Sequence, residues 1–157
     1  TYTTHHGTLT PREVAKIMAE VHIVIEPSLF QGYGLPGAEC MACGALLIST
    51  QCRGVDEYAT HGLNAWVVPH DLLGESVAAA VNILTGEDED DRAELLQVAA
   101  RGPEAVAETA WPIVGAKWAV YLAELYREEH PAGEWILEWA AIKARAEERL
   151  AEFYKNR

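Results

Sequence analysis

A glycine-rich segment between two short apolar runs constrains the fold of this chain more than any other feature. Residues 21–25 (VHIVI) and 45–49 (ALLIS) flank residues 27–44, which read PSLFQGYGLPGAECMACG. This order predicts a buried strand, a turn, a short helix over about residues 36–43 and a second strand, as in a parallel sheet. A turn that opens a helix with free backbone amides suits an anion, most often a phosphate.

Strands and helices alternate at first, and the chain then becomes helical. Thr10 and Glu13 form a capping box that predicts a helix to about Glu20, and residues 65–68 predict a third strand. Residues 1–5 offer a further strand. From Asp71, which can cap a helix, the pattern is helical. The later helices are predicted over about residues 72–84, 88–100 and 111–128, and over a last segment with the apolar stripe Trp135, Trp139, Ile142, Ala146, Leu150 and Phe153. This order predicts the α/β class, with a small parallel sheet that looks like part of a doubly wound domain.

The last stripe has two interpretations. Its spacing of three and four residues marks one face of an amphipathic helix, which most simply packs on its own domain. The alternative is a helix, over residues 134–155, that docks on a partner or on another domain.

Charge and hydropathy exclude several function classes. The chain has 157 residues, a net charge of -12 and a pI near 4.8. This acidity argues against nucleic acid and anionic membrane surfaces as partners, because both reward clustered Lys and Arg. The acidic run at residues 87–91 suits the solvated start of a helix, with a metal site as the alternative. No apolar run is long enough to span a bilayer.

The three cysteines favour a reducing, cytoplasmic location. Cys40 and Cys43 have the spacing of a zinc or redox motif, but a zinc site needs a second pair and Cys52 stands alone. We therefore expect small buried residues, with a redox pair as the alternative. The odd count and the lack of a signal-like segment favour the cytoplasm.

Three glycines of the segment match a dinucleotide-binding fingerprint. Gly32, Gly34 and Gly37 have the G-x-G-x-x-G spacing, and Asp56 lies at a suitable distance to bind a ribose. In that fingerprint, however, the first glycine follows its strand almost directly. Here residues 26–31 intervene, so the dinucleotide site is the less favoured interpretation.

The complete segment resembles the donor-site signature of retaining glycosyltransferases with the GT-B fold. The residues in register are Pro27-Ser28, Gly32-Tyr33-Gly34-Leu35-Pro36, Glu39 and Met41-Ala42-Cys43-Gly44, with flanking matches at His6-Gly7-Thr8-Leu9, Gly54, Glu57, Gly62, Asn64 and Val68-Pro69. The similarity extends over about residues 5–127. It implies that residues 1–127 are a Rossmann-like, C-terminal donor-binding domain, incomplete at its N-terminus. Residues 128–157 would then be a helical extension.

The resemblance also implies roles for the matching residues. Glu39 would accept hydrogen bonds from the ribose hydroxyls of a nucleotide-sugar, because a carboxylate can accept two bonds from a vicinal diol. The backbone of residues 32–35 would hold the donor sugar and its phosphates, and Ser28 and Leu29 would line the sugar pocket. The implied donor-binding residues are Ser28, Gly32, Tyr33, Gly34, Leu35 and Glu39, and the implied catalytic residues are Gln31 and Glu39. The structural alternative for Glu39 is a carboxylate bonded to its own helix start.

Three departures from the family pattern bear on activity. Gln31 stands where the family has a glutamate, so the hydrogen bonds remain but a negative charge beside the reacting sugar is lost. The family's diphosphate-binding Arg and Lys, and its N-terminal acceptor domain, precede the segment that corresponds to Thr1. We therefore expect little or no sugar transfer by this polypeptide alone.

The resemblance implies transfer of a sugar from a nucleoside-diphosphate sugar to an acceptor hydroxyl, such as that of a saccharide, with retention of configuration. The leaving phosphate would help to deprotonate the acceptor, and neither a metal nor another cofactor is expected. Two alternatives stay open. One is an inactive nucleotide-sugar binding or regulatory module, and the other is a different GT-B enzyme, such as a sugar-nucleotide epimerase or a phosphorylase.

Overall fold

The computed structural model describes residues 6–129 and 136–156, and its chain forms two compact units. The first unit ends at Ala107 and the second begins at Glu108. This division lies before residue 127, where we predicted the end of the donor-binding domain, because helix α6 (Trp111–Glu129) groups with α7 (Ile136–Lys155). The functional extent of that domain stays a prediction.

The first unit contains a parallel sheet of three strands in the order β1 (Ile23–Glu26), β2 (Leu46–Thr50) and β3 (Trp66–Val68). Every residue of β2 is buried, as expected for a central strand between two layers of helices. The predicted α/β class with a small parallel sheet is confirmed. A further strand, expected over residues 1–5, falls outside the described residues.

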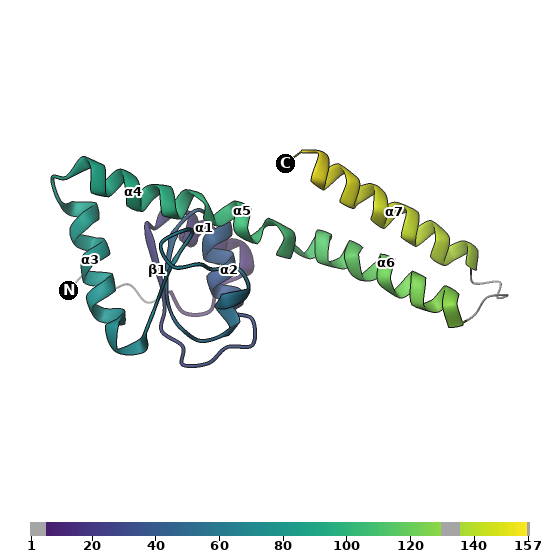
Figure 1. Cartoon of the computed structure of the whole chain (residues 1–157), viewed down its shortest axis with the longest axis horizontal. Coiled ribbons are helices and arrows are strands. Elements are labelled where there is room, and N and C mark those ends of the chain that lie inside the picture. Colours follow the sequence, from purple (N-terminus) through teal and green to yellow (C-terminus); the bar gives the residue numbers. More distant parts are fainter. Residues whose placement is uncertain (1–5, 130–135, 157) are drawn as a thin grey trace. The chain divides into compact units, whose positions relative to one another are not determined.

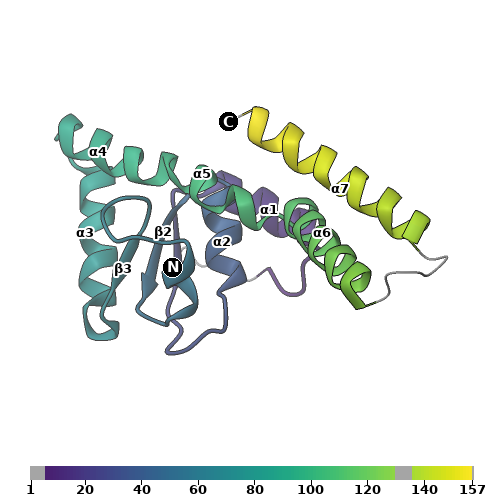
Figure 2. The same cartoon turned by 45° about the vertical axis from the view of Figure 1, so that its right-hand side comes forward.

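Helices cover both faces of the sheet (Figures 1 and 2). One layer contains α1 (Pro11–Glu20), α2 (Leu35–Ala42) and α5 (Gly102–Val106), and the other contains α3 (Leu73–Thr85) and α4 (Glu89–Ala100). Along β2, Leu47 joins the core under α2, whereas Leu46 and Ile48 join the core under α3 and α4. This alternation follows from the two-residue period of a strand. Short 3₁₀ turns cover Gly54–Glu57, His70–Leu72 and Ala107–Thr109.

The predicted capping box is confirmed, and the acidic run lies at the start of a helix, as predicted. Thr10 and Glu13 form both bonds of a capping box on α1, and Asp88 accepts the amides of Asp90 and Asp91 at the start of α4. The prediction that Asp71 caps a helix is wrong. A 3₁₀ turn leads directly into α3, whose N-cap residue has no side-chain hydrogen bond.

The second unit is a pair of packed helices, α6 and α7. Its buried residues include Ile113, Ala116, Ala123 and Ala146, and Lys143 on α7 forms an ion pair with Glu124 on α6 at 2.8 Å. The described part of the apolar stripe on α7 therefore packs within its own unit; Trp135 and the side chain of Trp139 lie outside the described residues. Within the described ranges, no helix is both long and apolar enough to cross a membrane.

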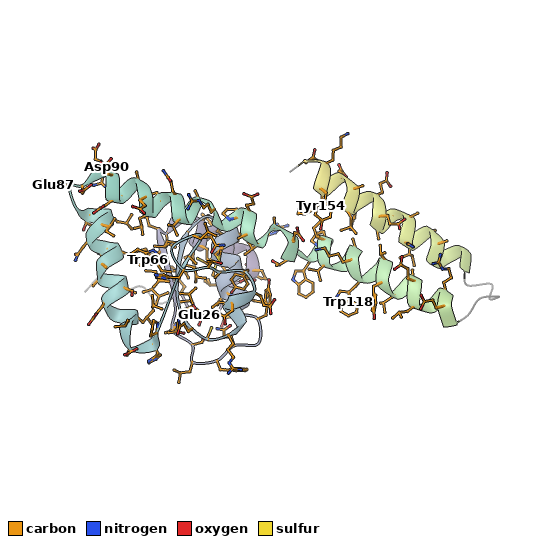
Figure 3. The ribbon with its side chains drawn as sticks, in the orientation of Figure 1. Glu26, Trp66, Glu87, Asp90, Trp118 and Tyr154 are labelled. Carbon is orange, nitrogen blue, oxygen red and sulfur yellow. The ribbon has the colours of Figure 1, made fainter. Side chains whose placement is uncertain are left out.

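Trp118 and Tyr121 of α6 are both exposed. Trp118 is 56% exposed within the structure, and Figure 3 shows it on the side of α6 that faces away from α7. Trp118 instead packs edge-on against Tyr121, with ring centroids 5.8 Å apart.

Candidate functional site

The glycine-rich turn, residues 27–34, connects the carboxyl end of β1 to the start of α2. In open parallel sheets, ligands bind outside the carboxyl ends of the strands. The turn therefore lies at the edge of the first unit where a binding site is expected.

Gly34 and Tyr58 fix the end of the turn. Gly34 is the N-cap residue of α2 with φ of 83°, a conformation that favours glycine. The Tyr58 hydroxyl donates a 2.5 Å hydrogen bond to the Gly34 carbonyl oxygen. Burial, followed by the neighbouring Tyr33, raises the pKa of Tyr58, so this hydroxyl stays protonated and can donate at neutral pH.

The segment after β2 supports the other end of the turn. The Gln31 amide donates to the Cys52 carbonyl at 3.1 Å, and the Thr50 hydroxyl donates to the Ser28 carbonyl. A Cβ on Gly54 would stand 2.7 Å from the Gln31 carbonyl oxygen, so only glycine allows this close approach. The turn is thus held by the end of β2 and the segment that follows it, and does not depend on its own sequence alone.

A buried carboxylate, Glu26, lies behind the turn. Glu26 is the last residue of β1 and is 8% exposed (Figure 3). Its Oε1 accepts the Ser28 hydroxyl at 2.5 Å and the Ser28 amide at 3.3 Å, and Ser28 Oγ accepts the Gln31 side-chain amide at 2.9 Å. The sequence analysis missed Glu26. Its only signal was an acidic residue at the end of an apolar run.

The structure brings together some of the predicted site residues. Ser28, Gln31 and Gly34 lie in the turn, with Gly32 and Leu35 exposed beside them. The ring of Tyr33 instead packs inward against Tyr58, at 5.2 Å between centroids. Its hydroxyl is buried and has no hydrogen-bond partner within the described residues. Leu29 is 76% exposed, so the apolar side chain predicted at the sugar pocket is accessible.

Glu39 lies apart from this cluster. It is exposed on α2 and borders a groove of 390 Å³ between α1 and α2. The other residues that line this groove are Leu9, Pro11, Val14, Ala15, Met18, Ala42 and Cys43. In the described part of the chain the Glu39 carboxylate forms no hydrogen bond to its helix start, so the structural alternative has no support. The carboxylate can accept hydrogen bonds from a ligand.

Arg53 places a cation next to the turn. Its backbone pairs with Gln31 across the isolated bridge between residues 31 and 53, and the residue is exposed. Its φ of 67° is the only positive value among the described residues other than glycine. Such strained backbone occurs often at functional sites. Arg53 lies outside the continuous glycine-rich segment, so the motif gives no signal of this cation.

The cysteines have structural positions. Cys40 is fully buried and Cys43 is partly buried, and their thiols donate to the carbonyls of Ala45 and Ala15. Burial, followed by the nearby Cys43, raises the pKa of the Cys40 thiol to about 12. Redox cysteines need a lowered pKa, so this supports the buried interpretation over the redox one. No group of three His, Cys, Asp or Glu side chains in the described ranges is arranged to hold a metal ion.

A comparison with protein families decides the assignment. The family model described as glycosyl transferases group 1 matches residues 2–87, which is more than half of the chain. The chain belongs to the group 1 glycosyltransferase family. The matched region includes the sheet, the glycine-rich turn and α2, and the family transfers glycosyl groups. No curated protein and no solved structure matches the chain.

Proposed function

We propose that this glycosyltransferase chain binds a nucleoside-diphosphate sugar at the glycine-rich turn, as the donor-binding part of a retaining enzyme. The observation that carries the proposal is the start of α2. Gly34 opens the helix in a left-handed conformation, and no side chain caps it. Pro36 has no amide hydrogen, and the Gly37 and Ala38 amides donate to the Gly34 carbonyl, whereas among the described residues the amides of residues 32–35 have no backbone acceptor outside the helix. These amides are therefore left for an anion, and a diphosphate fits this chemistry.

Glu39 is the proposed ribose ligand. Its exposed carboxylate can accept two hydrogen bonds from neighbouring hydroxyls, and it borders the apolar groove beside α1. The groove offers apolar side chains for the remainder of the nucleoside. The glycine-rich turn itself contains no Lys or Arg. The exposed Arg53, whose backbone pairs with Gln31, offers a positive charge for the diphosphate.

The proposed reaction transfers the sugar without a resident metal. The bond between the anomeric carbon and the phosphate oxygen breaks, and a bond to the acceptor oxygen forms on the same face. The acceptor proton passes to the leaving phosphate. Gln31, within the turn, accepts a hydrogen bond from the sugar, and an acceptor-binding domain completes the enzyme. The three free cysteines suit a reducing, cytoplasmic location.

Titration calorimetry with UDP, GDP, UDP-glucose and GDP-mannose tests this proposal. We expect the chain to bind one nucleotide series, and Glu39→Gln to weaken that binding about tenfold, as for a hydrogen bond to a charged group. The control is Glu75→Gln, which makes the same change at an exposed position of α3 and should leave the affinity unaltered. Equal affinities for the two variants would contradict the role of Glu39, and no binding by the wild type would contradict the donor site.

A further inference from the structure

Glu26 is a buried acid whose presence needs an explanation. It is 8% exposed, and no cation forms an ion pair with it within the described residues. Burying a carboxylate costs free energy unless hydrogen bonds compensate. Its recorded partners are the amide and hydroxyl of Ser28.

The hydrogen bond from Ser28 to Glu26 determines which group donates in the hydrogen bond between Ser28 and Gln31. An ionised carboxylate can only accept hydrogen bonds, so the single hydroxyl hydrogen of Ser28 must point to Glu26. Ser28 Oγ then has only lone pairs left to offer. The 2.9 Å contact with Gln31 therefore requires the NH₂ group of Gln31 to face Ser28.

Because the NH₂ group of Gln31 faces Ser28, the orientation of its side-chain carbonyl oxygen is also determined. Its carbonyl oxygen faces the end of the turn, 3.4 Å from where a Cβ on Gly34 would stand. A free glutamine can turn its amide over and present either end. Here the Glu26 carboxylate, acting through Ser28, leaves the carbonyl oxygen of Gln31 to face the end of the turn.

We propose that Glu26 is a positioning residue for the donor sugar, which holds the carbonyl oxygen of Gln31 toward the glycine-rich turn through Ser28. This inference rests on the donor site proposed above. It names the chemistry that the sugar must supply, which is a hydroxyl that donates to Gln31. The carboxyl group of this network belongs to residue 26 instead of residue 31, and linked hydrogen bonds polarise one another.

Calorimetry on the whole chain can separate this role from a general effect. Glu26→Gln keeps the size of the side chain but can both donate and accept, so the direction of the network is lost. We expect the affinity for the preferred sugar nucleotide, UDP-glucose or GDP-mannose, to fall about threefold to tenfold. The affinity for UDP or GDP alone should stay within about twofold, because Gln31 contacts the sugar.

Two further variants make the test specific. Glu26→Asp should keep most of the wild-type affinity. Like glutamate, an ionised aspartate only accepts hydrogen bonds, and it can reach the amide and hydroxyl two residues later. In a Gln31→Ala background, Glu26→Gln should have no added effect. The inference is overturned if Glu26→Gln binds sugar nucleotide as the wild type does, if it weakens nucleotide and sugar nucleotide equally, or if its effect persists without Gln31.

A ligand-free measurement keeps the inference separate from the proposed function. If the wild type binds none of the four ligands, the donor site fails, but the network can still be tested by NMR. We expect the side-chain amide protons of Gln31 to shift in Glu26→Gln and in Ser28→Ala, and to be unchanged in Glu75→Gln. Unchanged Gln31 protons in the first two variants would overturn the network itself.

Discussion

At the scale of single residues, Gly34 is the position on which the turn depends most. It combines a left-handed backbone with close neighbours, since an added Cβ would stand 2.9 Å from the Tyr58 hydroxyl oxygen and 3.2 Å from Val55 Cγ1. Gly44, which ends α2, has nearly the same φ, 80°, but a Cβ there would meet no atom within 4 Å. Substitutions at these two glycines therefore distinguish the effect of backbone strain from that of steric overlap.

We predict that Gly34→Ala destabilises the chain more than Gly44→Ala. Gly44→Ala should lower the free energy of unfolding by about 1–2 kcal/mol through backbone strain alone. Gly34→Ala should lower it by about 1–3 kcal/mol more, because the added methyl overpacks the site. Urea unfolding at 25 °C measures both values. Equal losses would contradict the close packing of Tyr58 against the turn.

At the scale of elements, helix starts show where local sequence is sufficient. Thr10 caps α1 as predicted, and Asp88 caps α4 within the acidic run that was predicted to start a helix, because the bonds involve residues two or three positions away. Asp71 offers the same chemistry but does not cap α3, since the 3₁₀ turn already gives the Leu73 amide the His70 carbonyl as its acceptor.

This difference gives a matched pair of variants. Asp88→Ala should lower the free energy of unfolding by about 1 kcal/mol, because the amides of Asp90 and Asp91 lose their acceptor. Asp71→Ala should change it by no more than about 0.5 kcal/mol, as for an ordinary surface position. Thermal or urea unfolding measures the difference. A larger loss at Asp71 would mean that it does cap α3.

Features that depend on distant partners could not be predicted. The first apolar run was placed at residues 21–25, but the strand covers residues 23–26, because pairing with β2 places Glu26 opposite Ser49. Likewise, Ala116 and Ala123 of α6 are buried, whereas Trp118 and Tyr121 of the same helix are exposed. Which face is buried depends on the partner helix and not on the pattern of one helix.

Some residues of the candidate site could be predicted from the sequence, and others depend on distant partners. The glycines and Glu39 were found because they lie in one continuous segment with a recognisable spacing. Thr50 and Tyr58 support that segment from later in the chain, through hydrogen bonds to the carbonyls of Ser28 and Gly34. Their role requires the fold. Even the match at Asn64 proves to be structural, because its side chain bonds the backbone of Thr60 and Tyr58.

At the scale of the whole molecule, the family match and the packing agree on one region. Residues 2–87 lie within the first unit, which contains the sheet, the turn and the groove beside Glu39. The second unit, with α6 and α7, lies outside the match, and a contact of this helical region with a partner stays a prediction. The account therefore assigns donor binding to the first unit alone.

An NMR titration of the ¹⁵N-labelled chain tests this central claim most directly. UDP, GDP and their glucose and mannose conjugates would be added in turn. The account predicts that the backbone amides of residues 32–35 and 39 shift with one nucleotide series, while those of exposed α3 residues such as Glu75 stay in place. Shifts confined to α6 and α7, or no shift with any of these ligands, would contradict it.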